Sequence, residues 1–360
     1  MKNWVRGKLS LLQISLAVAI LIVGLFLVEN TKFVQTTPYY DEQVKAAELM
    51  KISLQTIKEE RLKRNILVDQ KIDPNQTGII GADFSKITTT LGNLDSKRTS
   101  SNPAFAALMI KFFKEINLNK GDVIAIGASG SFPGLIIAAL SAAKTMELEP
   151  LIIYSVGSSQ YGANIPEFTF VSMLDILNER DIFPYRLLAI SMGGILDQAQ
   201  GMYYPDSREI IEEIIRASGI YFININNMAE NIKYRMQLYN QEAAGQDIKA
   251  FINIGGATPN YGKTDASLNY PGGLVANGPE IPEHSERGLI FEYQNLGVPV
   301  IHLLNIRELA LRNGIPIDPI PFPEIGAGGV YHQKIYKKEL IFLVIVAELL
   351  YLFWALKRNK

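Results

Sequence analysis

The chain has 360 residues, of which 48% are hydrophobic and 20% charged, and its formal net charge is -1 at pH 7. This length accommodates one large or two medium domains, and the near balance of charge argues against nucleic-acid binding, which usually goes with a basic excess. The absence of cysteine from the sequence excludes disulfides, thiolate metal sites and cysteine nucleophiles.

An uncharged apolar run lies close to the N-terminus. It extends from Leu9 to Val28, and at about 1.5 Å per residue it spans the roughly 30 Å hydrocarbon core of a bilayer. A cleaved signal peptide is the alternative, but its apolar region is normally about 7–15 residues long and ends in a small-residue cleavage site. Because VGLFLVENTKF offers no such site, we expect a retained transmembrane helix over residues 9–28.

A second apolar run lies close to the C-terminus, from Leu340 to Leu356, and is interrupted by Glu348. A buried core helix is the alternative. Aromatic residues toward the end of the run and the basic tail that follows are typical of a membrane exit. We therefore expect a second transmembrane helix over residues 338–356.

The basic residues at the N-terminus predict how the two transmembrane helices are oriented in the membrane. By the positive-inside rule they place residues 1–8 in the cytoplasm, and two spans return residues 357–360 there. The chain between the spans would then lie outside the cytoplasmic membrane. Glu348, inside the second span, is expected either to hydrogen-bond Ser15 of the first span or to contact a separate membrane partner.

The segment after the first span predicts a helix and then a loop. YYDEQVKAAELMKISLQTIKEERLKRN follows Pro38, with acids in its first turn and bases in its last. We expect a stalk helix within residues 29–68 that leads from the membrane to the domain. Residues 69–102 are rich in turn formers and predict a loop, which is uncommon in a compact domain unless it has a function. A helix is expected to begin at Asn102-Pro103.

From Gly121 onward, apolar runs that end in small residues alternate with helical segments. The runs are DVIAIGASG, PLIIYSVGSS, YRLLAISMGG, IYFININN, KAFINIGGATPN and VPVIHLLNI. Short, continuously apolar strands separated by helices indicate a parallel sheet that is buried on both faces. We therefore predict that residues 69–337 form an α/β domain with a doubly wound, Rossmann-like, mostly parallel sheet, flanked by the two transmembrane helices.

Five consecutive predicted strands end in Gly, Ser, Asn or Thr, and ligands of such sheets bind beyond the carboxyl ends of the strands. Small residues admit a ligand to the backbone, hydroxyls supply hydrogen bonds, and N–H groups at helix starts favour anions. The same residue types also serve simply as turn formers and caps. The ligand-binding candidates at these ends are Gly127, Gly130, Ser158, Ser159, Asn164, Gly193, Gly194, Gly255, Gly256 and Thr258.

Lys97 and Arg98 are the only adjacent basic pair in the 69–102 segment, and Thr99 follows them. If this segment folds over the strand ends, the pair brings positive charge to a site that already suits anions. A carboxylate ligand fits this chemistry because arginine can bind it through two hydrogen bonds. The three residues join the ligand-binding candidates, and a solvated surface pair is the alternative.

The segment GASGSFPG matches no nucleotide-binding motif, since it has neither the lysine of a P-loop nor GxGxxG spacing. The nucleophile elbow GxSxG is the closest pattern, and Gly127, Ser129 and Ser131 read GxSxS. Ser129 or Ser131 is therefore a candidate nucleophile. His302, at the end of the last predicted strand, is the candidate base, with a core histidine as the alternative. The three histidines lack metal-ligand spacing, which argues against a zinc site, so we expect no metal. We also expect no cofactor.

Four segments between the two predicted spans carry a resemblance to a known family: TGIIG, KITTTLGNLDSKRTSSNPAFAALM, GDVIAIGASGSFPGL and SVGSSQYGANIPEFTF. They are similar to the poly-γ-glutamate system protein family, bacterial membrane proteins associated with the machinery that makes and exports γ-linked polyglutamate. The likeness covers nearly the whole chain and is most specific in SKRTSSNP and GASGSFPG. It implies a role in that pathway, with the synthase membrane subunits as partners, and transfers no catalytic residues.

Three functions remain open at this point. The first is an anchored accessory protein of the poly-γ-glutamate system, whose extracytoplasmic domain binds a carboxylate-bearing ligand or the nascent polymer. The second is an anchored serine hydrolase or transferase that acts on γ-glutamyl bonds. The third is a scaffold, which predicts that no pocket exists at the strand ends.

Overall fold

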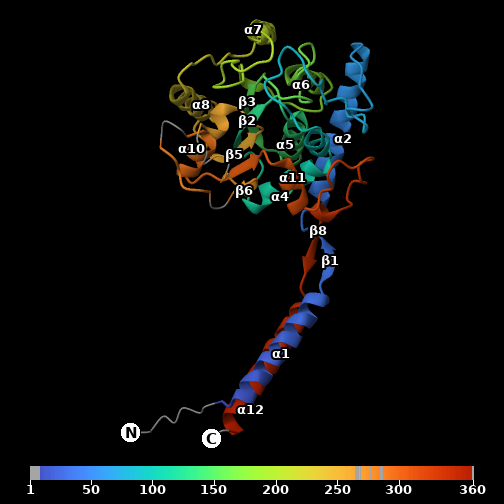
Figure 1. The fold of residues 1–360 in the computed structure, drawn as a ribbon, viewed down its shortest axis with the longest axis vertical. Coiled ribbons are helices and arrows are strands. Elements are labelled where there is room, and N and C mark those ends of the chain that lie inside the picture. Colours follow the sequence, from blue (N-terminus) through green and yellow to red (C-terminus); the bar gives the residue numbers. More distant parts are fainter. Residues whose placement is uncertain (1–8, 264–266, 268, 276–277, 284–286, 359–360) are drawn as a thin grey trace. The chain divides into compact units, whose positions relative to one another are not determined.

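The computed structural model describes residues 9–263, 267, 269–275, 278–283 and 287–358 (Figure 1). The chain separates into two compact units, one formed by the two ends of the chain and the other by Tyr39–Tyr331. The segment 1–8, predicted to be cytoplasmic, and the last two residues of the predicted tail lie outside the described residues.

The terminal unit contains two long helices and a two-stranded sheet. Helix α1 (Leu11–Asn30) leads into strand β1 (Phe33–Thr36), which pairs antiparallel with β8 (His332–Ile335) before α12 (Lys338–Arg358). Both helices are long and apolar enough to cross a membrane. Most of their side chains are exposed, which in water would be costly for Leu, Ile and Phe. The two predicted spans are thus present as helices.

Helices α1 and α12 contact each other through small residues and a few polar groups. Gly24 lies so close to Val344 that a Cβ atom on the glycine would come within 2.4 Å of Val344 Cγ1. Tyr351 donates its hydroxyl hydrogen to the carbonyl oxygen of Gln13, at 2.9 Å. Glu348 is buried between the helices, and its Oε2 has no hydrogen-bond partner. The expected bond between Glu348 and Ser15 does not form in the described part of the chain, because Ser15 points outward.

The second unit is a mixed α/β domain. Its strands are β2 (Val123–Ser129), β3 (Glu149–Ser155), β4 (Leu187–Ser191), β5 (Ile248–Ile254), β6 (Gly273–Val275) and β7 (Val300–Leu303). Its helices are α2 (Tyr40–Lys63), α3 (Leu94–Ser100), α4 (Ala104–Glu115), α5 (Pro133–Thr145), α6 (Phe170–Glu179), α7 (Ser207–Ser218), α8 (Met228–Glu242), α9 (Thr258–Tyr261), α10 (Leu289–Asn295) and α11 (Ile306–Arg312).

The strands form one six-stranded sheet in the order β4-β3-β2-β5-β7-β6. All neighbours are parallel except β6, which pairs antiparallel with β7 at one edge. The chain therefore starts at the centre with β2, moves outward to β4 and returns to the centre with β5. It then crosses to the opposite edge with β6, and β7 fills the place between β5 and β6. The prediction of a mostly parallel sheet is confirmed.

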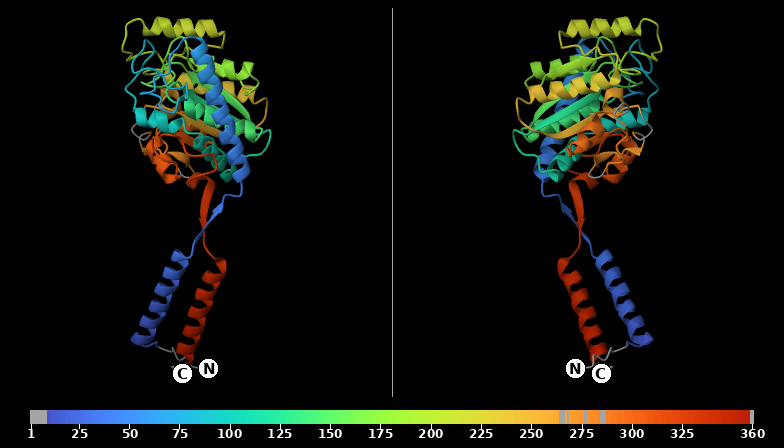
Figure 2. Two further views of the ribbon diagram at one scale, coloured as in Figure 1. Left: turned by 90° about the vertical axis from the view of Figure 1, so that its right-hand side faces the viewer. Right: turned by 90° about the vertical axis from the view of Figure 1, so that its left-hand side faces the viewer.

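Helices pack on both faces of this sheet (Figures 1 and 2). Alternate positions of β2 show why the strand reads as one apolar run: Ile124 and Ile126 join the core shared with α2, α4 and α5, whereas Val123 and Ala125 join the core shared with α8 and α10. All seven residues of β2 are buried. A strand covered on both sides has no solvent face, so it has no polar alternation.

Helix α2 is not the separate stalk expected within residues 29–68. It belongs to the same compact unit as the sheet and packs against α4 and α5. Ala46, Met50 and Ile57, at helical spacing, are completely buried in the core. The domain therefore begins at Tyr39 rather than at residue 69, because the apolar stripe of this helix packs into the core.

Two other expectations are corrected. The run at residues 220–227 is not a strand, since Phe222 makes only an isolated bridge to Ile190. It lies along the edge of β4, where the Ile190 backbone N–H donates to the Tyr221 carbonyl oxygen and the Ile190 carbonyl oxygen accepts from the Ile223 N–H.

The predicted loop 69–102 also contains α3, whose N-cap Asn93 accepts a hydrogen bond from the Ser96 backbone N–H at 2.8 Å.

Candidate functional site

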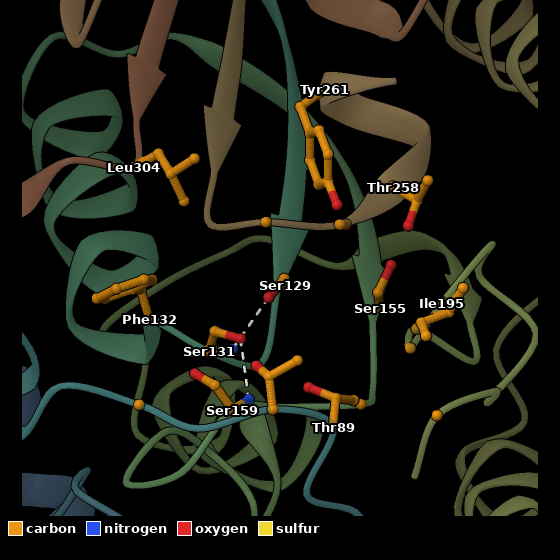
Figure 3. A pocket seen from close by; sticks show the side chains of 18 of the residues that line it. Thr89, Ser129, Ser131, Phe132, Ser155, Ser159, Ile195, Thr258, Tyr261 and Leu304 are labelled. Atoms are coloured by element: carbon orange, nitrogen blue, oxygen red, sulfur yellow. Dashed lines mark hydrogen bonds between the residues drawn. The ribbon is translucent and has the colours of Figure 1, made fainter. Parts of the chain in front are cut away.

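A cavity of about 780 Å³ opens at the carboxyl ends of the parallel strands (Figure 3). Each parallel strand contributes to its wall, either at its last residue or in the loop that follows. These contributions are Ser129 and Ser131 from β2, Ser155 from β3, Gly193 and Gly194 from β4, Gly256 and Thr258 from β5, and Leu304 from β7. A cavity therefore lies at the strand ends, where the scaffold hypothesis predicts none.

The loops after β2 and β3 are joined by serine hydroxyls at the cavity wall. Ser131 donates its backbone N–H to Ser129 Oγ at 3.1 Å, and Ser159 donates its backbone N–H to Ser131 Oγ at 3.0 Å (Figure 3). Gly130, between the two serines, packs so tightly that a Cβ there would lie 2.8 Å from the Val156 carbonyl oxygen. The small residues of GASGSFPG thus allow two loops to come together.

Lys97 reaches into this cavity from α3. Its side chain is almost fully buried, and its Nζ donates to the carbonyl oxygen of Ser131 and lies 2.7 Å from Ser159 Oγ. The Nζ also lies 3.8 Å from the centre of the Phe132 ring. Among the described residues, no carboxylate lies within ion-pair distance of it. Burial lowers the pKa of Lys97 to about 7, because the charged form loses its hydration.

The two residues that follow Lys97 point away from the cavity. Arg98 pairs with Asp318 through Nη1 at 3.1 Å and donates Nε–H to the Ile72 carbonyl oxygen at 2.8 Å. Thr99 Oγ1 accepts the backbone N–H of Asp318 at 2.9 Å. Consecutive helical residues point in directions about 100° apart. Of the three ligand-binding candidates on this segment, only Lys97 therefore lines the cavity.

A buried ionic network lies behind the cavity wall. Asp197 Oδ2 accepts from Arg235 Nη2 at 2.7 Å, and both side chains are at most 1% exposed. Asp197 Oδ1 accepts from the Ser191 hydroxyl at 2.8 Å and from the Gly193 N–H at 2.9 Å. The Ser155 and Ser191 hydroxyls, 2.9 Å apart, connect this network to the cavity. The network fixes the loop after β4, which supplies part of the wall.

The other predicted residues divide between the wall and its supports. Ser159, Gly193, Gly194, Gly256 and Thr258 line the cavity, with Ser129 and Ser131. Gly127, Gly130, Ser158, Asn164 and Gly255 do not.

These supporting residues hold the loops around the wall. Asn164 binds the backbone of Ala82 through both ends of its amide and donates to Thr88 Oγ1 at 3.0 Å. Ser158 is bridged to Thr88 through the backbone. Gly255, with a φ of 82°, makes the turn under Ser129 that a residue with a Cβ rarely adopts.

His302 is placed away from the serines. It is buried on β7, where its Nδ1 lies 2.9 Å from Asn253 Nδ2 and its ring meets the edge of Tyr270. Burial lowers the pKa of His302 to about 4, so the imidazole is neutral near pH 7. It does not line the cavity, and no hydrogen bond between described residues joins it to Ser129 or Ser131. The geometry is that of a core histidine.

Some wall residues were missed in the sequence. Ser155, Phe132 and Tyr261 line the cavity, as do the consecutive residues 89–93 of the predicted loop. The loop thus folds over the strand ends. The pattern SVGSS already contains Ser155, and its place at the end of an apolar strand is the signal that could have identified it.

The described part of the chain contains no group of three or more His, Asp or Glu side chains arranged to hold a metal ion. The cavity wall offers hydroxyl groups, backbone groups, the Asn93 amide, the buried amine of Lys97 and the exposed amine of Lys263. Comparisons with protein-family models, with curated proteins and with solved structures found no match.

Proposed function

We propose that the chain is a two-pass membrane component of the poly-γ-glutamate system, and that its α/β unit binds a carboxylate-bearing ligand, such as the end of a γ-glutamyl chain, on the outer side of the membrane. The observation that carries the proposal is Lys97, a buried amine in a strand-end cavity with no acidic partner among the described residues. The pathway rests on the sequence resemblance described above.

A carboxylate is the ligand class that best completes this site. A buried ammonium group without a counter-ion is costly, and an entering carboxylate offsets that cost with a charge-assisted hydrogen bond. The hydroxyls of Ser129, Ser131 and Thr258 line the same cavity and can donate to the remaining oxygens. One buried cation selects a chain end without holding the polyanion along its length, as a broadly basic surface would do.

The position of the cavity also fits a doubly wound, Rossmann-like sheet, which we propose as the architecture. The strand order moves outward from β2 in one direction and from β5 in the other. In such sheets, ligands bind where the direction of strand order reverses. Ser129 ends β2, and Gly256 follows β5, and both line the cavity.

The two apolar helices supply the membrane attachment in this proposal. Glu348 is buried between them with a carboxyl oxygen that lacks a partner, and small residues such as Gly24 allow close helix contact. The membrane subunits of the polymer synthase are the partners that we propose for this pair.

Binding of γ-glutamyl oligomers to the full-length protein in detergent tests the proposal. Isothermal titration with oligomers of a few residues should show saturable binding at pH 6.5, and α-amidated neutral oligomers should bind more weakly. Lys97→Met should reduce affinity roughly 10- to 100-fold, since a hydrogen bond to a charged group contributes about 1.5–3 kcal/mol. Lys249→Met, an exposed lysine paired with Asp247, is the matched control. Equal affinity for charged and neutral oligomers would contradict the proposal.

A further inference from the structure

Lys97 and Ser159 form a pair that goes beyond ligand binding. Lys97 Nζ lies 2.7 Å from Ser159 Oγ, both side chains are more than nine-tenths buried, and both line the cavity. They come from segments far apart in the sequence, α3 and the loop after β3. A hydroxyl within hydrogen-bond reach of an amine is the geometry of a nucleophile and its base.

The surroundings of Lys97 suit an amine that gains and loses a proton. A neutral amine has two hydrogens and one lone pair. Because one N–H is directed at the Ser131 carbonyl oxygen, the lone pair is free to accept the Ser159 hydroxyl hydrogen. Once protonated, the ammonium is stabilised by that same carbonyl and by the Phe132 ring, 3.8 Å from Nζ. Burial brings the pKa of Lys97 near neutrality, where a general base works best.

We propose that Ser159 is the nucleophile and Lys97 the general base of an acyl-transfer site that cleaves or transfers γ-glutamyl amide bonds. The choice of substrate rests on the proposed function. Ser159 Oγ bonds to the γ-carbonyl carbon while its proton passes to Lys97 Nζ. The C–N bond then breaks, and Lys97 returns the proton to the departing amine nitrogen, which leaves a γ-glutamyl ester on Ser159.

The second half of the reaction restores the pair. Water, or the amine of another glutamyl chain, attacks the ester carbonyl and gives a proton to Lys97, and the Ser159 oxygen leaves and takes that proton back. The products are a free γ-carboxyl group after hydrolysis or a new amide after transfer. Ser131, whose Oγ accepts the Ser159 N–H at 3.0 Å, keeps its own hydroxyl hydrogen to donate to the substrate carbonyl oxygen.

Active-site labelling tests the nucleophile independently of substrate. The full-length protein in detergent is treated with a fluorophosphonate probe, and the modified peptide is mapped by mass spectrometry. The expected adduct is on Ser159. It is absent in Ser159→Ala and retained in Ser141→Ala, which removes a fully buried hydroxyl without a hydrogen-bond partner from α5. An adduct elsewhere, or none in the folded wild-type protein, overturns the proposal.

A second variant tests the base even if Ser159→Ala fails to fold. Ser159→Cys introduces the only thiol of the chain, because the sequence contains no cysteine. With Lys97 beside it, that thiol should react with iodoacetamide at pH 7 at least tenfold faster than in the background of Lys97→Met, since a nearby ammonium stabilises the thiolate. Equal rates in the two backgrounds refute the pairing.

Turnover of γ-glutamyl oligomers separates this inference from the proposed function. Chain length is followed by mass spectrometry, with Lys97→Met expected to be about 10²–10⁴-fold slower, the usual contribution of a general base. Oligomers that bind but are neither shortened nor transferred leave the proposed function standing and refute the catalytic inference. If the probe labels Ser159 but no oligomer binds, the assignment of Ser159 as nucleophile stands and the proposed γ-glutamyl ligand is refuted.

Discussion

At the scale of single residues, Lys97 determines what the cavity can do. It is a titratable side chain with its amine buried at the cavity wall, and its neighbours are a carbonyl, a hydroxyl and an aromatic ring rather than an acid. In such surroundings the amine exists near neutral pH as a mixture of charged and neutral forms. The charged form binds an anion and the neutral form accepts a proton, so the same residue serves both proposals made above.

The buried amine predicts a specific dependence of stability on pH. The pKa of Lys97 is about 7 in the folded protein and about 10.4 in an unfolded chain. Between these values the unfolded state binds more protons, so the free energy of unfolding rises with pH, by up to about 1.4 kcal/mol per unit for this group. Below pH 7 the full cost of the buried charge is present. Lys97→Met removes this term.

Denaturant unfolding of the full chain in detergent, followed by near-UV circular dichroism from pH 6 to pH 9.5, measures the effect. The stability of Lys97→Met relative to wild type should be greatest at pH 6 and should fall steadily above pH 7. The exposed Lys249→Met is the control, and its difference from wild type should stay flat. A flat difference for Lys97→Met as well would show that Lys97 titrates normally.

The sequence predicted which segment lines the cavity better than it predicted which of its residues do so. SKRTSSNP indicated that positive charge comes to the strand ends, and Lys97 does line the cavity. Arg98, its neighbour, instead pairs with Asp318, more than two hundred positions away in the sequence. The direction of each side chain depends on where α3 begins and on what packs against it, and neither is encoded in the local pattern.

At the scale of elements, the loop after β4 is held by a buried ion pair. Asp197 is in the left-handed region with a φ of 62°, and it joins that loop to Arg235 of α8. Breaking a buried pair leaves an uncompensated charge, which costs about 3–5 kcal/mol. Asp197→Asn keeps a side chain that tolerates this backbone and removes only the charge, so it should destabilise the protein by that amount.

A double-mutant cycle distinguishes this pair from general packing. Arg235→Met should also be destabilising, whereas the double variant with Asp197→Asn should lose less stability than the sum of the two single changes. Chemical denaturation of the four proteins under one condition gives the coupling energy. Simple additivity would mean that the two side chains do not stabilise each other.

The elements themselves were predictable where both faces of a segment are buried. The runs that became β2, β3, β4, β5 and β7 are continuously apolar because helices cover both sides of the sheet. IYFININN has a similar composition, but it forms only an isolated bridge at the edge of β4 and is not a strand of the sheet. Its Tyr221 side chain remains exposed. Helix α2 was recognised as a helix, yet its place in the core depends on partners far along the chain, α4 and α5. Local pattern gives the type of element, and long-range packing decides its place.

At the scale of the whole molecule, the proposal depends on which side of the membrane the α/β unit occupies. Two apolar helices at the two ends of the chain would return both ends to one side of a bilayer. The cavity can then bind exported polymer only if the α/β unit lies on the outer side of the membrane. A nucleotide-dependent enzyme would instead require the unit to face the cytoplasm.

Single-cysteine labelling in intact cells decides the orientation with little background, because the natural chain contains no cysteine. Lys249→Cys, at the start of β5, replaces an exposed side chain of the α/β unit. Lys357→Cys replaces an exposed one in the last turn of α12. A membrane-impermeant maleimide should modify the first variant in intact protoplasts and the second only after permeabilisation. The reverse order would place the cavity in the cytoplasm, where the resemblance-based role in polymer handling outside the membrane could not operate.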